Sequence, residues 1–193
     1  MFTVTLDTFL VSDTHFGHDN IVTYCNRPKN HEQVIVQNWN SVVSDEDDVL
    51  HLGDLIFNNA RGSIYARQLR GRKRLLKGNH DSGSKKWFLD RGFEKLDGKS
   101  LNWTSPEGLS VIFSHEPIGS HREWDINIHG HIHNNGYLGH HEDQIAGLDL
   151  SRDYRNISIE VMDYTPVRLR EVLYGGKYQS SQNVVQHIQR ASA

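Results

Sequence analysis

Apolar runs that end in polar, potentially metal-binding side chains are the most restrictive feature of this sequence. The run Arg74–Lys77 leads through Gly78 into Asn79, His80 and Asp81. Short apolar runs are typical of buried strands, and a glycine directly after one permits a sharp turn. An amide oxygen, an imidazole and a carboxylate can serve as metal ligands or in acid–base chemistry. Taken alone, this loop is as consistent with an ordinary surface turn as with a metal-binding or catalytic site.

The same arrangement recurs at four other places in the chain. Four further apolar runs are followed by such side chains. Asp13 and His15 follow 9–12, Asp54 follows 49–53, His115 follows 109–114, and His131 and His133 follow 126–130. In open α/β sheets, ligands bind beyond the carboxyl ends of the strands. Recurrence at all these strand ends indicates a common site rather than unrelated turns.

Composition restricts the class of protein further. The length of 193 residues fits one domain, 1–193, with a polar tail from about 175 to 193. No run is apolar enough for a membrane span, and no signal-peptide pattern is present. The single cysteine, Cys25, excludes a thiolate zinc cluster and favours a reducing, cytoplasmic compartment. The net charge of −3 gives no strong sign of nucleic-acid or membrane binding, and nothing indicates the oligomeric state.

The order of the elements predicts an α/β chain. Helical patterns cover 30–43, 59–70, 84–91 and 165–173, with a capping box at Asn30 and Gln33, Ile64 facing inward, and Thr165 as a cap. Later strands are expected at 93–96, 101–104, 109–114, from 126, and at 156–161. The order begins βαβαβα and ends in strands, so two mixed β-sheets packed face to face with helices outside accommodate it best.

The polar strand ends together resemble the calcineurin-like metallophosphoesterase family. The motifs are Asp13-x-His15, Gly53-Asp54, Gly78-Asn79-His80-Asp81, His115 and Gly130-His131-x-His133, in this order over residues 13–133. This resemblance implies a four-layer αββα sandwich with a dinuclear metal centre.

The resemblance also assigns roles to the strand-end residues. Asp13, His15 and His133 resemble ligands of a first metal, Asn79, His115 and His131 resemble ligands of a second, and Asp54 resembles the carboxylate that bridges them. A nitrogen and oxygen donor set without thiolate suits manganese, iron, nickel, cobalt or zinc better than calcium or magnesium alone. Two divalent metal ions are therefore the expected cofactors.

His80 is the motif residue left without a metal. The resemblance implies that it faces the substrate, that Asp81 orients its ring, and that a metal-bound water or hydroxide is the nucleophile. His18 and Arg122 are candidates for substrate binding. Each residue could instead have a purely structural role, His18 as a loop residue and Arg122 as one partner of a surface ion pair. His51 and His129 fit structural roles best.

The implied activity is hydrolysis of phosphodiester bonds, with monoesters as a further option, in small or nucleotide substrates. A nuclease of the same fold is one alternative and would need a basic groove. The cations between 67 and 77 could supply one, but they also fit helix ends and strand edges. A non-catalytic protein-binding module is the other alternative, and the intact His80 and ligand positions disfavour it.

Overall fold

The larger of two β-sheets comes mostly from the first half of the chain. The computed structural model describes residues 3–119, 124–134, 148 and 153–175. Four strands of this sheet are parallel in the order β4-β3-β2-β1, and β9 pairs antiparallel with β1 at the edge. These strands are β1 (Phe9–Val11), β2 (Asp48–His51), β3 (Arg72–Leu75), β4 (Phe93–Lys95) and β9 (Val167–Arg168).

The smaller sheet comes from the second half of the chain and has the order β5-β6-β7-β8. Only the β5–β6 pair is antiparallel, so both sheets are mixed, as expected. Its strands are β5 (Ser100–Thr104), β6 (Ser110–Ser114), β7 (Ile126–His129) and β8 (Asp153–Asn156).

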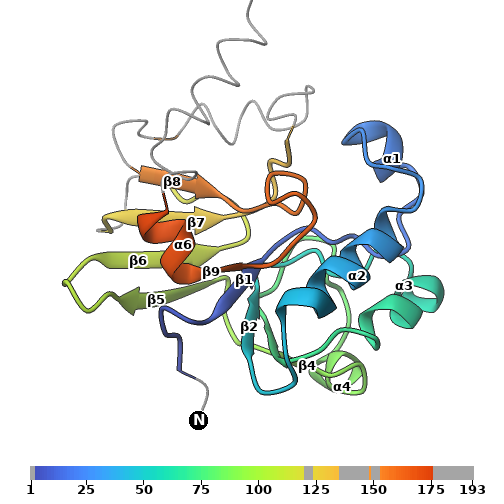
Figure 1. Ribbon diagram of the computed structural model, residues 1–193, viewed down its shortest axis with the longest axis horizontal. Helices are drawn as coiled ribbons and strands as arrows, with labels where there is room; N and C mark the ends of the chain where they lie inside the picture. Colours follow the sequence, from blue (N-terminus) through green and yellow to red (C-terminus); the bar gives the residue numbers. More distant parts are fainter. Residues whose placement is uncertain (1–2, 120–123, 135–147, 149–152, 176–193) are drawn as a thin grey trace, which may run out of the picture.

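Helices cover the outer face of the larger sheet. Figure 1 shows α2 and α3 on one side of β1 and β2, and the smaller sheet on the other. The helices are α1 (Ile21–Tyr24), α2 (His31–Val42), α3 (Asn59–Ala66), α4 (Lys85–Leu89) and α6 (Leu169–Tyr174). None of these helices has the length and apolar character needed to cross a membrane.

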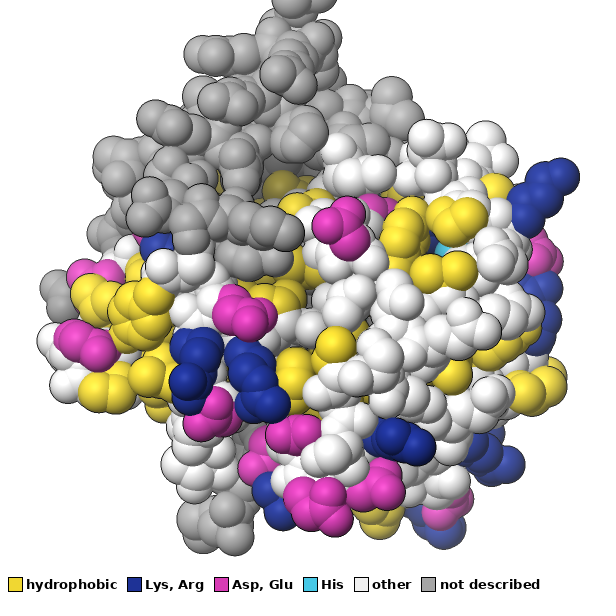
Figure 2. Space-filling view, viewed as in Figure 1, with side chains coloured by type: hydrophobic (Ala, Val, Ile, Leu, Met, Phe, Trp, Pro, Cys, Tyr) yellow, Lys and Arg dark blue, Asp and Glu magenta, His cyan; other side chains and the backbone are white. Residues whose placement is uncertain are grey.

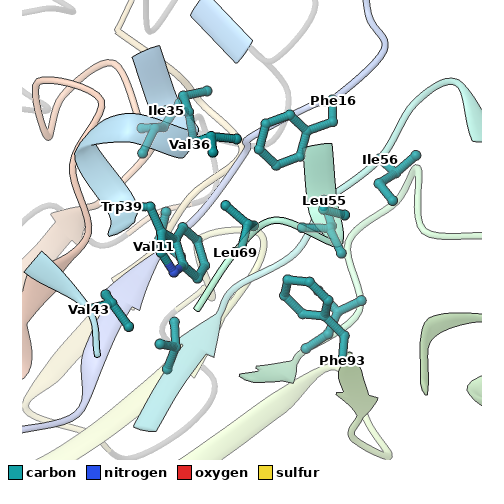
Figure 3. Close-up of a cluster of buried hydrophobic side chains, with 14 of the residues drawn as sticks. Val11, Phe16, Ile35, Val36, Trp39, Val43, Leu55, Ile56, Leu69 and Phe93 are labelled. Atoms are coloured by element: carbon teal, nitrogen blue, oxygen red, sulfur yellow. The ribbon is translucent and has the colours of Figure 1, made fainter. Parts of the chain in front are cut away.

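The outer core lies between α2 and the larger sheet. Ile35, Val36 and Trp39 recur at helical spacing and form one buried face of α2. They pack in one cluster with Val11 of β1 and with Leu69 (Figure 3). The indole N–H of Trp39 donates to a backbone carbonyl oxygen at 3.0 Å, so this large side chain is buried with its polar atom satisfied.

The inner core lies between the two sheets. Side chains alternate along β1, so Leu10 points into the inner core whereas Phe9 and Val11 belong to the outer one. Leu10 packs in one cluster with Val111 and Phe113 of β6, and the apolar face of α6 joins the same cluster. Burial of each such leucine contributes about 1.5–3 kcal/mol. On the outer face of the smaller sheet, a further buried cluster contains no residue of the described helices. Its members are Ile112, Trp124, Ile132 and Tyr154.

The last strand and the last helix have different boundaries from those predicted. The strand predicted at 156–161 ends at Asn156, because the Asn156 side chain accepts hydrogen bonds from the backbone N–H and the hydroxyl of Ser158 and turns the chain. The helix predicted from Thr165 begins only at Leu169, since Val167 and Arg168 pair with β1 as β9.

Two smaller expectations were also wrong. The Asn30 side chain makes no capping hydrogen bond to α2. Ile64 is 62% exposed, and the buried positions of α3 are instead Gly62, Ser63 and Ala66. Small side chains allow α3 to approach the chain beneath it, where a Cβ on Gly62 would lie 2.4 Å from the carbonyl oxygen of Phe16.

Candidate metal centre

The predicted ligands come together beyond the carboxyl ends of the parallel strands. Backbone hydrogen bonds join the first two ligand loops, from Asp13 N–H to the carbonyl of Gly53 and from His15 N–H to the carbonyl of Asp54. Two groups result, Asp13 with His15 and His133, and Asp54 with His115 and His131, and the ligand atoms of each lie within 4.8 Å of one another. We call them the first and second clusters. The second cluster also includes Asn79, whose Oδ1 lies 2.8 Å from His115 Nε2.

The Asp54 carboxylate belongs to the second cluster and also faces the first. Its Oδ2 is 3.4 Å from Nε2 of His15 in the first cluster and 3.3 Å from Nε2 of His115 in the second. One oxygen atom therefore contacts an imidazole from each cluster. The family resemblance implies a bridging role for Asp54, and this position is the one that such a role needs.

In the second cluster, Nε2 of His115 faces several atoms that carry lone pairs. Its Nδ1 lies 2.9 Å from the carbonyl oxygen of Leu52, which can only accept, so Nδ1 carries a proton. In the neutral ring Nε2 then holds a lone pair, yet it faces the acceptor oxygens of Asn79 and Asp54 and, at 3.1 Å, Nδ1 of His131. A cation about 2.1 Å from each ligand would set neighbouring ligand atoms about 3.0–3.4 Å apart. The spacing of the second cluster therefore fits a bound metal ion.

The first cluster contains buried polar atoms that lack hydrogen-bond partners. Both ring nitrogens of His15 and Oδ1 of Asp13 are buried and make no hydrogen bond within the described residues. Nδ1 of His133 contacts the Glu160 carboxylate at 3.1 Å, which leaves the lone pair of the neutral ring on Nε2. Buried polar groups are normally paired, so this arrangement also fits a cation.

Charge compensation within the protein supports the same conclusion. Burial raises the pKa of Asp13, but His115, His133 and His15 outweigh burial and hold that pKa far below its ordinary value. Burial lowers the pKa of His115, but its hydrogen bond to Asp54 and the charges of Asp13 and Asp54 raise it to about 9. Buried carboxylates that favour a proton on the imidazole also favour a metal ion in its place.

Two glycines in the ligand motifs provide space rather than unusual backbone angles. A Cβ on Gly78 would lie 2.2 Å from Oδ1 of Asp54, and a Cβ on Gly130 would lie 2.2 Å from Oδ2 of Asp13. Neither glycine has a positive φ. The sharp turn predicted at Gly78 is therefore not what requires glycine there, since any side chain would displace the neighbouring carboxylate.

Five of the candidate ligand residues have unusual backbone conformations. The left-handed values of φ are 60° for Asp13, 49° for His15, 56° for Asp54, 70° for His131 and 49° for His133. Non-glycine residues in this region cost about 1–3 kcal/mol in the less favourable cases and cluster at functional sites. The fold therefore holds these residues in a backbone conformation that they do not favour intrinsically.

His80 lies at the open side of the site. Its side chain is 43% exposed, its Nε2 is 3.9 Å from Oδ2 of Asp54, and its ring centroid is 5.5 Å from that of His15. The predicted role of Asp81 in orienting this ring is wrong. The buried Asp81 carboxylate instead accepts backbone N–H groups of Asp54, Leu55 and Gly78, at 2.8, 3.1 and 2.9 Å. Asp81 thus fixes one ligand loop against another.

The remaining candidate residues differ in their surroundings. His18 lies beside the first cluster, with ring centroids 5.6 Å from His15 and 3.9 Å from Phe57. Arg122 lies outside the described residues. His51 is fully buried with Nε2 3.2 Å from the Thr14 hydroxyl, and His129 is fully buried with Nδ1 2.9 Å from the carbonyl oxygen of Gly130.

Sequence reasoning missed a buried ion pair behind the first cluster. Arg27 donates to the Glu160 carboxylate at 2.6 Å and to the backbone carbonyls of Asp13 and Thr14 at 2.6 and 2.8 Å. Burial raises the pKa of Glu160, but Arg27 and His133 outweigh it and lower that pKa to about 2. Arg27 and Glu160 are separated by 133 residues, so no local pattern links them.

We predict that Glu160→Gln destabilises the metal-free protein in a pH-dependent way. Removal of one partner from a buried ion pair costs about 3–5 kcal/mol. The folded-state pKa of Glu160, about 2, lies below its ordinary value of 4.5. Its stabilising contribution is therefore complete above about pH 5 and disappears as the pH falls from 4.5 to 2. Urea unfolding with a chelator, at pH values from 7 down to 3, measures the difference between wild type and variant.

A matched control is Glu94→Gln. Glu94 pairs with Arg74 at 2.8 Å, but its side chain is 56% exposed, so the expected loss is within about 1 kcal/mol. If Glu160→Gln cost no more than Glu94→Gln at pH 7, the buried network would not stabilise the fold.

Comparison with known proteins agrees with this geometry. Residues 7–190 match the family model of the calcineurin-like phosphoesterases. An uncharacterized protein of Methanocaldococcus jannaschii is 36% identical over 173 residues, which cover 83% of this chain and 86% of that protein. The gene 66 protein of Mycobacterium phage L5 is 30% identical over 173 residues, covering 70% and 81%.

A solved structure of similar fold comes from Aquifex aeolicus. This protein of unknown function has a TM-score of 0.65 and 28% identity, and the alignment covers 86% of the present chain and 96% of the other. The match to the family model extends over nearly the whole sequence, and it includes every strand-end ligand. The chain therefore belongs to the calcineurin-like phosphoesterase family.

Proposed function

We propose that this protein hydrolyses phosphodiester bonds with two divalent metal ions, drawn from manganese, iron, nickel, cobalt and zinc. The observation that carries the proposal is the pair of ligand clusters that share the space around Oδ2 of Asp54. When bound, two such cations polarise the phosphoryl oxygens and activate water for an in-line displacement. A cytoplasmic location remains part of this proposal.

The chain's own ligands divide between the two metals. Asp13, His15 and His133 would hold the first, Asn79, His115 and His131 would hold the second, and Asp54 would be shared between them. Burial lowers the pKa of His15 well below its ordinary value, so this ring is held in the neutral form that binds metals. Arg27 and Glu160 support the first metal indirectly by fixing His133 and the backbone of Asp13.

His80 provides the acid–base group of the proposal. Its backbone N–H donates to Oδ1 of Asp54 at 2.9 Å, so the loop that carries it is fixed to this carboxylate. Its side chain reaches solvent on the side from which a substrate can approach. From there it can donate a hydrogen bond to a phosphoryl oxygen or a proton to the leaving alkoxide.

A small substrate is favoured over a long nucleic acid. Much of the basic segment between 67 and 77 is used within the fold. Arg72 pairs with Asp48, Arg74 pairs with Glu94, and the ammonium of Lys73 donates to backbone carbonyls. On the face seen in Figure 2, Lys and Arg side chains alternate with Asp and Glu. Cations that are paired in this way do not form the basic groove that a nuclease would need, which supports a small phosphodiester substrate.

The first prediction from this proposal concerns the substrate charge. A diester carries a single negative charge, which two cations and His80 can balance, whereas a monoester carries nearly two charges and binds the metals more firmly in the ground state. We expect a higher kcat/KM for bis-p-nitrophenyl phosphate than for p-nitrophenyl phosphate, measured with each metal in turn. A clear preference for the monoester would contradict the assignment of the protein as a diesterase.

The second prediction separates two neighbouring residues of the loop after β3. We expect His80→Ala to retain both metal ions and to lose about 10²–10⁴ in kcat, the usual contribution of a positioned acid–base group. Asn79→Ala should instead weaken the binding of the second metal. Metal content by elemental analysis and hydrolysis of bis-p-nitrophenyl phosphate measure the two effects. If His80→Ala released metal and Asn79→Ala did not, the two roles would be exchanged.

A further inference from the structure

A pocket of about 350 Å³ lies beside the second cluster. Its walls come from the loop after β3, the start of β5 and the segment after β6. Asn79 and His115 line it and also belong to the second cluster, so the pocket is continuous with the candidate metal centre. A phosphoryl group bound at the metals would therefore have room to direct one of its ester substituents into this pocket.

The size of the pocket limits what can enter it. Small-molecule pockets usually measure about 300–1,000 Å³, so this one is at the small end of the range. It has room for a group about the size of one nucleotide. Pro117 and Ile118 supply an apolar wall, whereas Asn79 and Ser100 supply polar groups. This lining suits a substituent that combines an apolar ring with polar atoms.

Two lysines give the pocket an excess of positive charge. Lys77 and Lys99 line it together with one carboxylate, that of Glu116. Both lysines are exposed, and neither forms an ion pair with any residue of the described parts of the chain. By contrast, Lys85 pairs with Asp97 at 2.6 Å and Lys86 pairs with Asp90 at 3.1 Å. The two pocket ammonium groups are thus available to an anion that enters from solvent.

We propose that this pocket binds a substituent that carries a phosphate of its own, with Lys77 and Lys99 as residues that determine specificity. The substrate class is then a short nucleotide diester with a terminal phosphate, rather than a diester whose only negative charge is that of the scissile phosphate. This inference rests on the proposed phosphodiesterase function. It adds a second anion site to the phosphoryl site, because flexible lysines bind phosphate as point charges and need no fixed geometry.

Thymidine dinucleotides with and without a terminal phosphate test the inference. We expect wild type to show a kcat/KM at least about tenfold higher for the dinucleotide phosphorylated at its 5′ or its 3′ end than for the unphosphorylated dinucleotide. The double variant Lys77→Gln/Lys99→Gln should lose about tenfold on the preferred phosphorylated substrate. It should remain within about twofold of wild type on the unphosphorylated dinucleotide and on bis-p-nitrophenyl phosphate. High salt should weaken the preference in wild type, because these charges are exposed.

The control is Lys85→Gln/Lys86→Gln, which removes two exposed lysines of α4 that already have acidic partners. It should leave the preference for a terminal phosphate unchanged. The inference is overturned if wild type does not prefer either phosphorylated dinucleotide, or if the Lys77/Lys99 variant lowers kcat/KM equally for every diester. Either result leaves the proposed diesterase function standing.

A direct binding measurement covers the case in which no diester is hydrolysed at all, which would instead overturn the proposed function. Calorimetric titration of thymidine 3′,5′-bisphosphate should then show binding to wild type that weakens about tenfold or more in the Lys77→Gln/Lys99→Gln variant. Equal affinity in the two proteins, or no binding to wild type, would overturn the pocket assignment.

Discussion

The position of the Asp54 carboxylate determines how the rest of the site is built. One of its oxygens lies within 3.4 Å of an imidazole from each cluster, and the other accepts the backbone N–H of His80. This carboxylate can occupy that position only because Gly78 has no side chain. The Asp81 carboxylate also accepts the backbone N–H groups of Asp54 and Gly78 and so fixes both residues. The loops after β2 and β3 are thus joined around one buried anion.

Such a site is intrinsically unfavourable in the absence of a cation. Five ligand residues have left-handed backbone conformations, and buried polar atoms of Asp13 and His15 make no hydrogen bond among the described residues. The two sheets and their shared core hold these residues in place, and burial of an unpaired polar group is costly. A ligand that binds only the folded state stabilises it by mass action. Metal binding is therefore expected to relieve the local cost and to raise the stability of the whole domain.

Much of the site could be predicted because its residues follow the strands directly. Apolar runs that end in Asp, His or Asn place their side chains at one edge of a sheet, and all the metal ligands predicted in this way lie together. The Arg27–Glu160 pair could not be predicted, because the two residues are far apart in the sequence and only the tertiary fold brings them together. The true partners of Asp81 are backbone groups, which carry no sequence pattern. Likewise, β9 forms because the edge of β1 is free to pair, although the local sequence favours a helix.

Metal content is the most direct test of the central claim that Asp54 joins two metal sites. The comparison needs wild type, Asp54→Asn and the control Asp90→Asn, in which the changed side chain is 50% exposed and lies on the surface next to α4. After loading with manganese or zinc and removal of free ions, elemental analysis should find two metal ions per chain in wild type and in the control. It should find one or none in Asp54→Asn, because a neutral amide cannot share a negative charge between two cations. Two full equivalents in Asp54→Asn, or fewer than two in wild type, would contradict the account.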